Sequence, residues 1–260
     1  MIDLKEFKEI TLDWRVPVLV TAIYIIYVKR QNKIFESVPP YVRPRYSPLT
    51  FFMVIHNLIL CLFSIICFVK SFPIVYYHYK TKTLFEFMAD QDHTMRTDLN
   101  HWFWIFYLSK YYEIVDTIIL HLNRRKTSFL QMYHHAGAII CCWMLASCHN
   151  HLSWIFVVLN SFVHSIMYFY YSLTCIGIKS KYKYLITQMQ MAQFILGCCI
   201  LVLHLFVDEI WSEDKYLKIF QISAFVSNLL YVSILYVLFS KFSRDTYGAK
   251  RGNANKLKKM

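Results

Sequence analysis

Residues 49–69 read LTFFMVIHNLILCLFSIICFV and contain no Asp, Glu, Lys or Arg. A helix of about 20 apolar residues spans the hydrocarbon core of a bilayer, so this segment predicts a transmembrane helix. Comparable runs, some interrupted by a few polar residues, lie at 14–28, 99–122, 129–146, 152–175, 184–207 and 219–239. The pattern predicts an all-α polytopic membrane protein with seven transmembrane helices.

The composition is that of a single membrane domain covering residues 1–260. Hydrophobic residues make up 57% of the chain, with only 5 Gly and 6 Pro, which differs from an average soluble domain. Most of the 8 cysteines fall in apolar runs, so no disulfide framework is predicted. The N-terminus lacks the basic segment and cleavage site of a signal peptide. We expect residues 1–13 to be a lumenal N-terminus, about 14–239 the bundle, and 240–260 a basic cytosolic tail.

Basic residues in the loops predict the orientation. The chain has 28 Lys and Arg against 16 Asp and Glu, a formal net charge of +12. Cytoplasmic loops of membrane proteins are enriched in Lys and Arg, and here these residues gather at 29–48, 123–128, 179–183 and 240–260. We therefore expect a lumenal N-terminus, a cytosolic C-terminus and no nucleic-acid partner.

The C-terminal tail resembles an address for the endoplasmic reticulum. Lys258 and Lys256 stand third and fifth from the end, as in a KxKxx-like retrieval signal. A chance match is the alternative, because basic tails are common. We expect a multi-pass protein of the endoplasmic reticulum membrane.

Charged residues inside the third apolar run are candidates for function. Ionisable groups at membrane depth cost about 2.5–3.5 kcal/mol each on insertion scales. In KYYEIVDT, Lys110, Glu113, Asp116 and Thr117 recur at spacings that place them on roughly one helix face. An ion pair that only fixes helix packing is the alternative, but Lys110 could neutralise just one of the two acids.

Three further runs carry polar stripes at helical spacing. Gln131, His134 and His135 share one face of the run at 129–146. Packing histidines and hydrogen bonds between helices are the alternatives. The next two runs carry a tyrosine-rich and an amide-rich stripe, formed by Asn160, His164, Met167, Tyr168 and Tyr171, and by Thr187, Gln190 and Gln193.

The depth of these residues indicates one shared site. At 1.5 Å per residue, His134, Gln190 and Asp116 lie about 10–12 Å below the nearest cytosolic basic residue. His164 is expected deeper, at about 22 Å, unless Gly177 ends its helix early. All four clusters fall in the cytosolic half of the bundle. An acyl-CoA, with a polar end in the cytosol and a hydrocarbon end toward the lumen, fits this arrangement.

These motifs resemble the ELO-type fatty acid elongases over the region from Lys110 to Phe194. K-x-x-E-x-x-D-T begins at Lys110, N-x-x-x-H-x-x-M-Y-x-Y-Y begins at Asn160, and T-x-x-Q-x-x-Q-F ends at Phe194. The histidine box departs from the commonest form, H-x-x-H-H, because Gln131 stands in its first position. This variant resembles fungal, algal and protist members, and it leaves the chain preference open.

The resemblance implies a bundle that encloses an acyl tunnel and condenses malonyl-CoA with an acyl-CoA. The product would be a 3-ketoacyl-CoA two carbons longer, released with CO2 and CoA, with no bound cofactor or metal. A neutral imidazole can attack a thioester to give an acyl-imidazole. Carried onto this sequence, the resemblance implies that His134 is the nucleophile and that His164 faces it. The other candidates would orient the histidines or bind substrate: His135, Gln131, Lys110, Glu113, Asp116, Asn160, Tyr168 and Gln190.

Loop residues and bulky side chains complete the expected substrate path. The candidates for the CoA phosphates are Arg124, Arg125, Lys126, Lys181 and Lys183, although such residues also follow from loop charge alone. Trp143, Phe156 and Leu201 are expected to limit chain length at the lumenal end. The implied partners are the lipid bilayer and the ketoacyl reductase, dehydratase and enoyl reductase of the elongation cycle, with a homodimer left open.

Two other classes share parts of this pattern. A membrane di-iron desaturase or hydroxylase also has histidine boxes, but it needs ligands from several boxes, and only His134 and His135 form one here. A seven-helix receptor or transporter would share the topology. It would not require a lysine, two acids and three histidines at one depth.

Overall fold

The computed structural model describes residues 3–178, 182–207 and 211–257, with side chains through residue 247. Within these residues the regular elements are all α-helices, which confirms the all-α prediction. Lys181 and Lys258 lie outside the described residues. The helices are α1 (Leu4–Leu12), α2 (Arg15–Ile34), α3 (Pro48–Thr81), α4 (Leu84–Ala89), α5 (Thr94–Tyr112), α6 (Ile114–Leu122), α7 (Phe129–Ser147), α8 (Ser153–Cys175), α9 (Lys183–His204) and α10 (Lys215–Leu257).

Several helices are suited to cross a membrane. Among the described residues, α3, α8, α9 and α10 are long and apolar enough, and α1 with α2, bent by 60°, would make a fifth span. The runs at 99–122 and 129–146 form α5–α6 and α7, but these helices are not both long and apolar enough to count as membrane spans by the same criterion. These two segments contain Lys110, Glu113, Asp116 and His134 of the candidate site. The fold is thus a multi-pass membrane architecture, and the count of seven spans remains a prediction.

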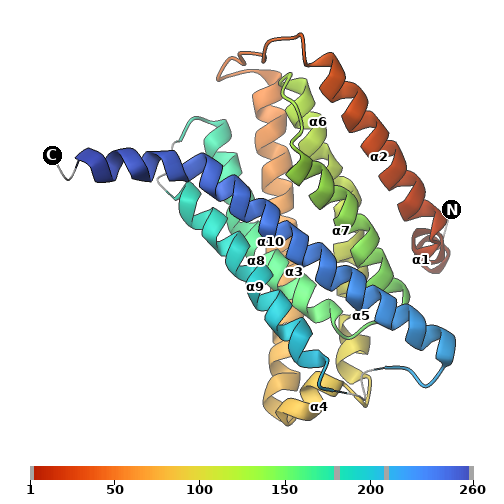
Figure 1. The fold of residues 1–260 in the computed structure, drawn as a ribbon. Coiled ribbons are helices and arrows are strands. Elements are labelled where there is room, and N and C mark those ends of the chain that lie inside the picture. The colour runs from red at the N-terminus through yellow and green to blue at the C-terminus, as the bar shows by residue number, and fades with distance from the viewer. Residues whose placement is uncertain (1–2, 179–181, 208–210, 258–260) are drawn as a thin grey trace.

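The helices form one elongated bundle, shown in Figure 1. Helix α3 packs along α8, α10 crosses α9 and α7, and α5 packs against α7, α3 and α8. The α2–α3 and α6–α7 connections lie at one end of the bundle, whereas α4 and the α9–α10 connection lie at the other (Figure 1). This arrangement places α7 and α8, which carry the predicted catalytic histidines, against neighbours on several sides.

Local sequence signals position the helices that carry the site. The Ser128 hydroxyl accepts a hydrogen bond from the Gln131 backbone N–H at 3.2 Å, so α7 is capped just before its histidines. Helices α5 and α6 follow each other with a break at Glu113. Gly177, at φ +82, follows the end of α8, as its left-handed backbone conformation allows.

Aromatic side chains hold the C-terminal end of α1 against the bundle. Trp104 Nε1 donates to Thr11 Oγ1 at 3.0 Å, and the Tyr107 hydroxyl donates to the Thr11 carbonyl at 2.8 Å. Trp143 Nε1 donates to the Leu12 carbonyl at 2.7 Å. Trp143 therefore anchors α1, whereas the sequence predicted that it would limit the acyl tunnel.

Candidate active site

A buried network joins the end of α5 to α8. Lys110 and Glu113 are 4% and 2% exposed, and Lys110 Nζ lies 2.7 Å from Glu113 Oε1 and 3.1 Å from Asn160 Oδ1. Because Lys110 donates to the oxygen of the Asn160 amide, the amide nitrogen faces His164 Nε2, at 3.0 Å. His164 Nδ1 lies 3.8 Å from Glu113 Oε1. Each side chain thus fixes the orientation of the next one.

Asp116 is held by residues of two other helices. His56 Nε2, on α3, lies 2.8 Å from Asp116 Oδ1, and the Tyr168 hydroxyl of α8 donates to Asp116 Oδ2 at 2.8 Å. The second nitrogen of His56, Nδ1, lies 3.3 Å from the Tyr112 hydroxyl. A carboxylate inside a bundle is costly unless hydrogen-bonded. These contacts supply that bonding and join α3, α6 and α8.

His134 is held by a tyrosine of α10. The Tyr231 hydroxyl lies 3.1 Å from His134 Nδ1 and donates to the His134 carbonyl oxygen at 2.9 Å. The His134 and His164 rings lie 6.4 Å apart, centroid to centroid. The structure therefore brings these two histidines together, although residue counting had placed His164 deeper. Counting along a helix measures depth only when the helix is upright, and these helices cross each other at an angle (Figure 1).

The remaining members of the histidine box lie against α2 and α6. Gln131 Nε2 donates to Thr117 Oγ1 at 3.3 Å, and the Tyr24 hydroxyl lies 3.0 Å from the same oxygen. His135 is buried and packs edge-on against Tyr24, with ring centroids 6.2 Å apart. Gln131 and His135 also line the wide cavity, together with His134 and His164.

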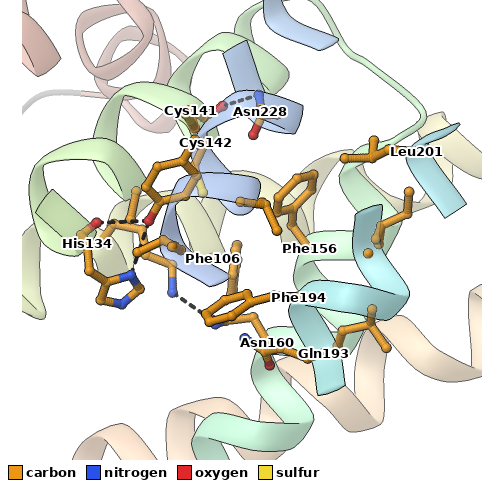
Figure 2. Close-up of a pocket in the computed structure, with 18 residues that line it drawn as sticks. Phe106, His134, Cys141, Cys142, Phe156, Asn160, Gln193, Phe194, Leu201 and Asn228 are labelled. Atoms are coloured by element: carbon orange, nitrogen blue, oxygen red, sulfur yellow. Dashed lines mark hydrogen bonds between the residues drawn. The ribbon is translucent and has the colours of Figure 1, made fainter. Parts of the chain in front are cut away.

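Two cavities meet at His134. A wide cavity of about 730 Å³ is bounded by α3, α6, α7, α8, α9 and α10, and its lining includes Asp116, His164 and Gln190. A narrow pocket of about 60 Å³ has a mostly apolar lining. His134, Gln193 and Phe194 line both. In Figure 2, His134 and Leu201 lie on opposite sides of the narrow pocket, with Phe156 nearer to Leu201.

Basic side chains approach the wide cavity from one end of the bundle. Arg125 and Lys183 line it, as does Arg43 of the α2–α3 connection. Arg124 lies over the Tyr41 ring at 5.9 Å, and Lys126 lies 3.8 Å from Glu36; neither of the two is among its lining residues. Lys110 lines the narrow pocket instead and is paired with Glu113.

The sequence comparisons agree with the motifs. The profile of the family described as ELO: GNS1/SUR4 matches residues 10–256. The chain belongs to this family. It is 31% identical over 213 residues to "Fatty acid elongase sre1" of Dictyostelium discoideum, covering 80% of this chain and 77% of that protein. It is 33% identical over 211 residues to "Very long chain fatty acid elongase 6" of Mus musculus, covering 78% and 76%. The family resemblance seen in the motifs is confirmed.

Some residues of this ELO family site lie outside the motifs. His56 and Tyr231 stand in apolar runs, where a lone histidine or tyrosine is usually a packing residue, and Arg43 stands in a loop rich in basic residues. Gly137 of α7, which lies against the Tyr231 ring, is also outside the motif positions. Its only sequence signal is that a glycine is unusual in the middle of a helix.

The part of the ELO chain that the structure describes contains no group of three or more His, Cys, Asp or Glu side chains arranged to hold a metal ion. His149 lies 3.2 Å from Asn100, and the His151 and His204 rings are tilted against each other with centroids 5.2 Å apart. None of these three histidines lines the wide cavity or the narrow pocket.

Proposed function

We propose that this ELO protein catalyses the condensing step of fatty acid elongation. It joins malonyl-CoA to a long-chain acyl-CoA and gives a 3-ketoacyl-CoA two carbons longer, CO2 and CoA. The observation that carries the proposal is that His134 lines both the wide cavity and the narrow apolar pocket. A thioester bound with the first carbons of its hydrocarbon chain at the narrow pocket and its CoA in the wide cavity places its carbonyl carbon beside this imidazole.

Hydrogen bonding supports His134, in preference to His164, as the proposed nucleophile. The Asn160 amide nitrogen lies 3.0 Å from His164 Nε2 and donates to it, because the oxygen of the same amide accepts from Lys110. The Nε2 lone pair of His164 is therefore occupied. In the described part of the chain, His134 Nε2 has no hydrogen-bond partner. His164 is then the group that orients the substrate or handles protons.

The reaction divides into two steps at His134. In the first, a lone pair of the imidazole forms a bond to the thioester carbon, and the C–S bond breaks with its electron pair on sulfur, which leaves as CoA. In the second, malonyl-CoA loses CO2, and the electron pair of the broken C–C bond attacks the acyl carbon. The acyl–nitrogen bond then breaks and returns its pair to the imidazole, which takes up one proton from water and becomes neutral again. No strong base is needed, because decarboxylation supplies the carbon nucleophile.

Arg43, Arg125 and Lys183 are suited to bind the CoA phosphates. All three line the wide cavity, and guanidinium and ammonium groups are common phosphate ligands. Loop charge supports an orientation in which this end of the bundle faces the cytosol. We extend the proposal to seven spans, in which α5–α6 and α7 also cross the membrane, and to the endoplasmic reticulum. Reductases and a dehydratase would consume the product there.

The acyl-enzyme is tested by adding acyl-CoA without malonyl-CoA to the purified full-length protein. We expect a burst of free CoA of about one equivalent per active site. His134→Ala should abolish both the burst and turnover. His149→Ala, a histidine beside Asn100 and outside both cavities, is the matched control and should keep both. Turnover without a burst in wild type would leave a single-step condensation, and absence of any elongated product would refute the function.

A further inference from the structure

We propose that Tyr231 is a positioning residue that keeps the His134 proton on Nδ1 and so makes Nε2 the reactive nitrogen. The inference rests on the proposed acyl transfer at His134. Tyr231 is 8% exposed and belongs to α10, nearly a hundred residues away from His134 in the chain. It was not part of the histidine box or of the other motifs.

Counting protons on the two contacts gives the tautomer. A tyrosine hydroxyl carries one proton, and Tyr231 donates it to the His134 carbonyl oxygen at 2.9 Å. The second contact, at 3.1 Å from the same hydroxyl to Nδ1, is then attractive only if Nδ1 carries a proton and donates it. A neutral imidazole has a single N–H. Nε2 therefore keeps its lone pair.

A glycine makes this contact possible. Gly137 lies one turn after His134 on α7, where α10 crosses it. A Cβ at this position would lie 2.3 Å from Tyr231 Cε2 and 2.6 Å from Cδ2, much closer than carbon atoms approach without covalent bonding. Gly137 costs helix stability relative to alanine. The absence of a side chain there lets the tyrosine ring lie against the helix and reach both atoms of His134.

The contact also assists the covalent step. When the Nε2 lone pair forms the bond to the acyl carbon and the C–S bond breaks toward sulfur, the ring gains positive charge while it still carries the Nδ1 proton. The hydrogen bond from Nδ1 to the Tyr231 oxygen then becomes charge-assisted and stronger. An interaction that strengthens as charge develops lowers the barrier. The acyl-imidazole becomes neutral when Nδ1 loses its proton, and the CoA thiolate takes up one proton to leave as the thiol.

The tautomer can be measured without any reaction. We would record 15N spectra of the full-length protein labelled at histidine, and identify the His134 signals by their loss in His134→Gln. We expect a protonated Nδ1 and an unprotonated Nε2. Tyr231→Phe keeps the ring but removes the hydroxyl, so the signals should change toward a mixture of tautomers. A wild-type His134 protonated on Nε2, or an unchanged pattern in Tyr231→Phe, would overturn the inference.

Kinetics test the consequence with a matched control. Tyr231→Phe should slow the acyl-CoA burst about tenfold, with the KM for acyl-CoA changed less than about twofold, since one hydrogen bond to the reacting ring is lost. Gly137→Ala should shift the 15N pattern in the same direction, because it displaces the same ring. Tyr133→Phe, on α7 beside Tyr231 with ring centroids 5.6 Å apart, should leave both readouts at wild-type values. An equal loss in Tyr133→Phe would also overturn the inference.

If Tyr231→Phe changes the His134 15N signals but the wild-type protein releases no CoA, the tautomer assignment is supported and the acyl-enzyme is refuted.

Discussion

At the residue scale, Glu113 and Asp116, the two acids inside the bundle, each contact a side chain that can carry a positive charge. Glu113 accepts from Lys110 at 2.7 Å, and Asp116 lies 2.8 Å from His56. Burying a charge is costly unless it is paired and hydrogen-bonded. These pairs allow acids to exist at membrane depth, and they orient the neighbouring histidines. Among the described histidines at the two cavities, His134 alone has both a hydrogen bond that fixes its ring and a position lining both spaces.

The first box position is predicted to tolerate histidine. Gln131→His should retain turnover within about threefold, because the Gln131 side chain bonds Thr117 at the edge of the site, and Tyr24 keeps its own contact with that hydroxyl. Steady-state kcat and KM for acyl-CoA and malonyl-CoA would measure this. Gln131→Leu, which removes the polar group at similar size, is the comparison and should be worse than Gln131→His. Loss of turnover in Gln131→His would show that the amide has a direct role.

At the scale of secondary structure, one helix break and one close helix–helix contact position parts of the site. The third apolar run is two helices broken at Glu113, and the break places Lys110 toward the narrow pocket and Asp116 toward the wide cavity. Helix α10 was expected to be an ordinary span. Its close approach to α7 at Gly137 instead brings Tyr231 to His134. Departures from regular packing thus coincide with the chemistry.

Product length is predicted to depend on α8 and α9. Phe156 and Leu201 line the narrow pocket, so Phe156→Ala or Leu201→Ala should lengthen the main product by at least one two-carbon step, because removing the bulk extends the space. Gas chromatography of products from a host without its own elongases would show the shift. Trp143→Ala, which removes an anchor of α1 outside the pocket, should not lengthen the product. If neither pocket variant lengthened the product, the acyl chain would have to run in another direction.

At the scale of the whole molecule, basic side chains lie at one end of the substrate path and the apolar pocket lies toward the other end. The connections that hold Arg43 and Arg125 lie at the same end of the bundle (Figure 1), and both residues line the wide cavity. The narrow apolar pocket extends from His134 toward Leu201 (Figure 2). Leu201 lies near the C-terminal end of α9, at the other end of the bundle from these connections (Figure 1). A molecule with an anionic head and a hydrocarbon tail therefore has one favourable orientation in the protein.

The orientation in the membrane is predicted by the same asymmetry. A tag after Met260 should be digested by protease added to sealed microsomes, whereas a tag before Met1 should be protected until detergent is added, because Lys and Arg accumulate in cytoplasmic loops. Immunoblots against each tag would measure this. Protection of the C-terminal tag would reverse the topology, and equal digestion of both would exclude an odd number of spans.

The sequence by itself determined the helical membrane class, the family and the residues His134, His164, Lys110, Glu113 and Asp116 as candidates. Apolar runs and motif spacings are properties of neighbouring residues, so they can be read along the chain. Only the tertiary structure decided which side chains these candidates contact. His56 reaches Asp116 across 60 residues and Tyr231 reaches His134 across 97. Such contacts depend on how the helices cross and rotate against one another. At Gly137, for example, the absence of a side chain lets α10 approach α7 closely. No local sequence pattern distinguishes His56 or Tyr231 from other polar residues in apolar runs.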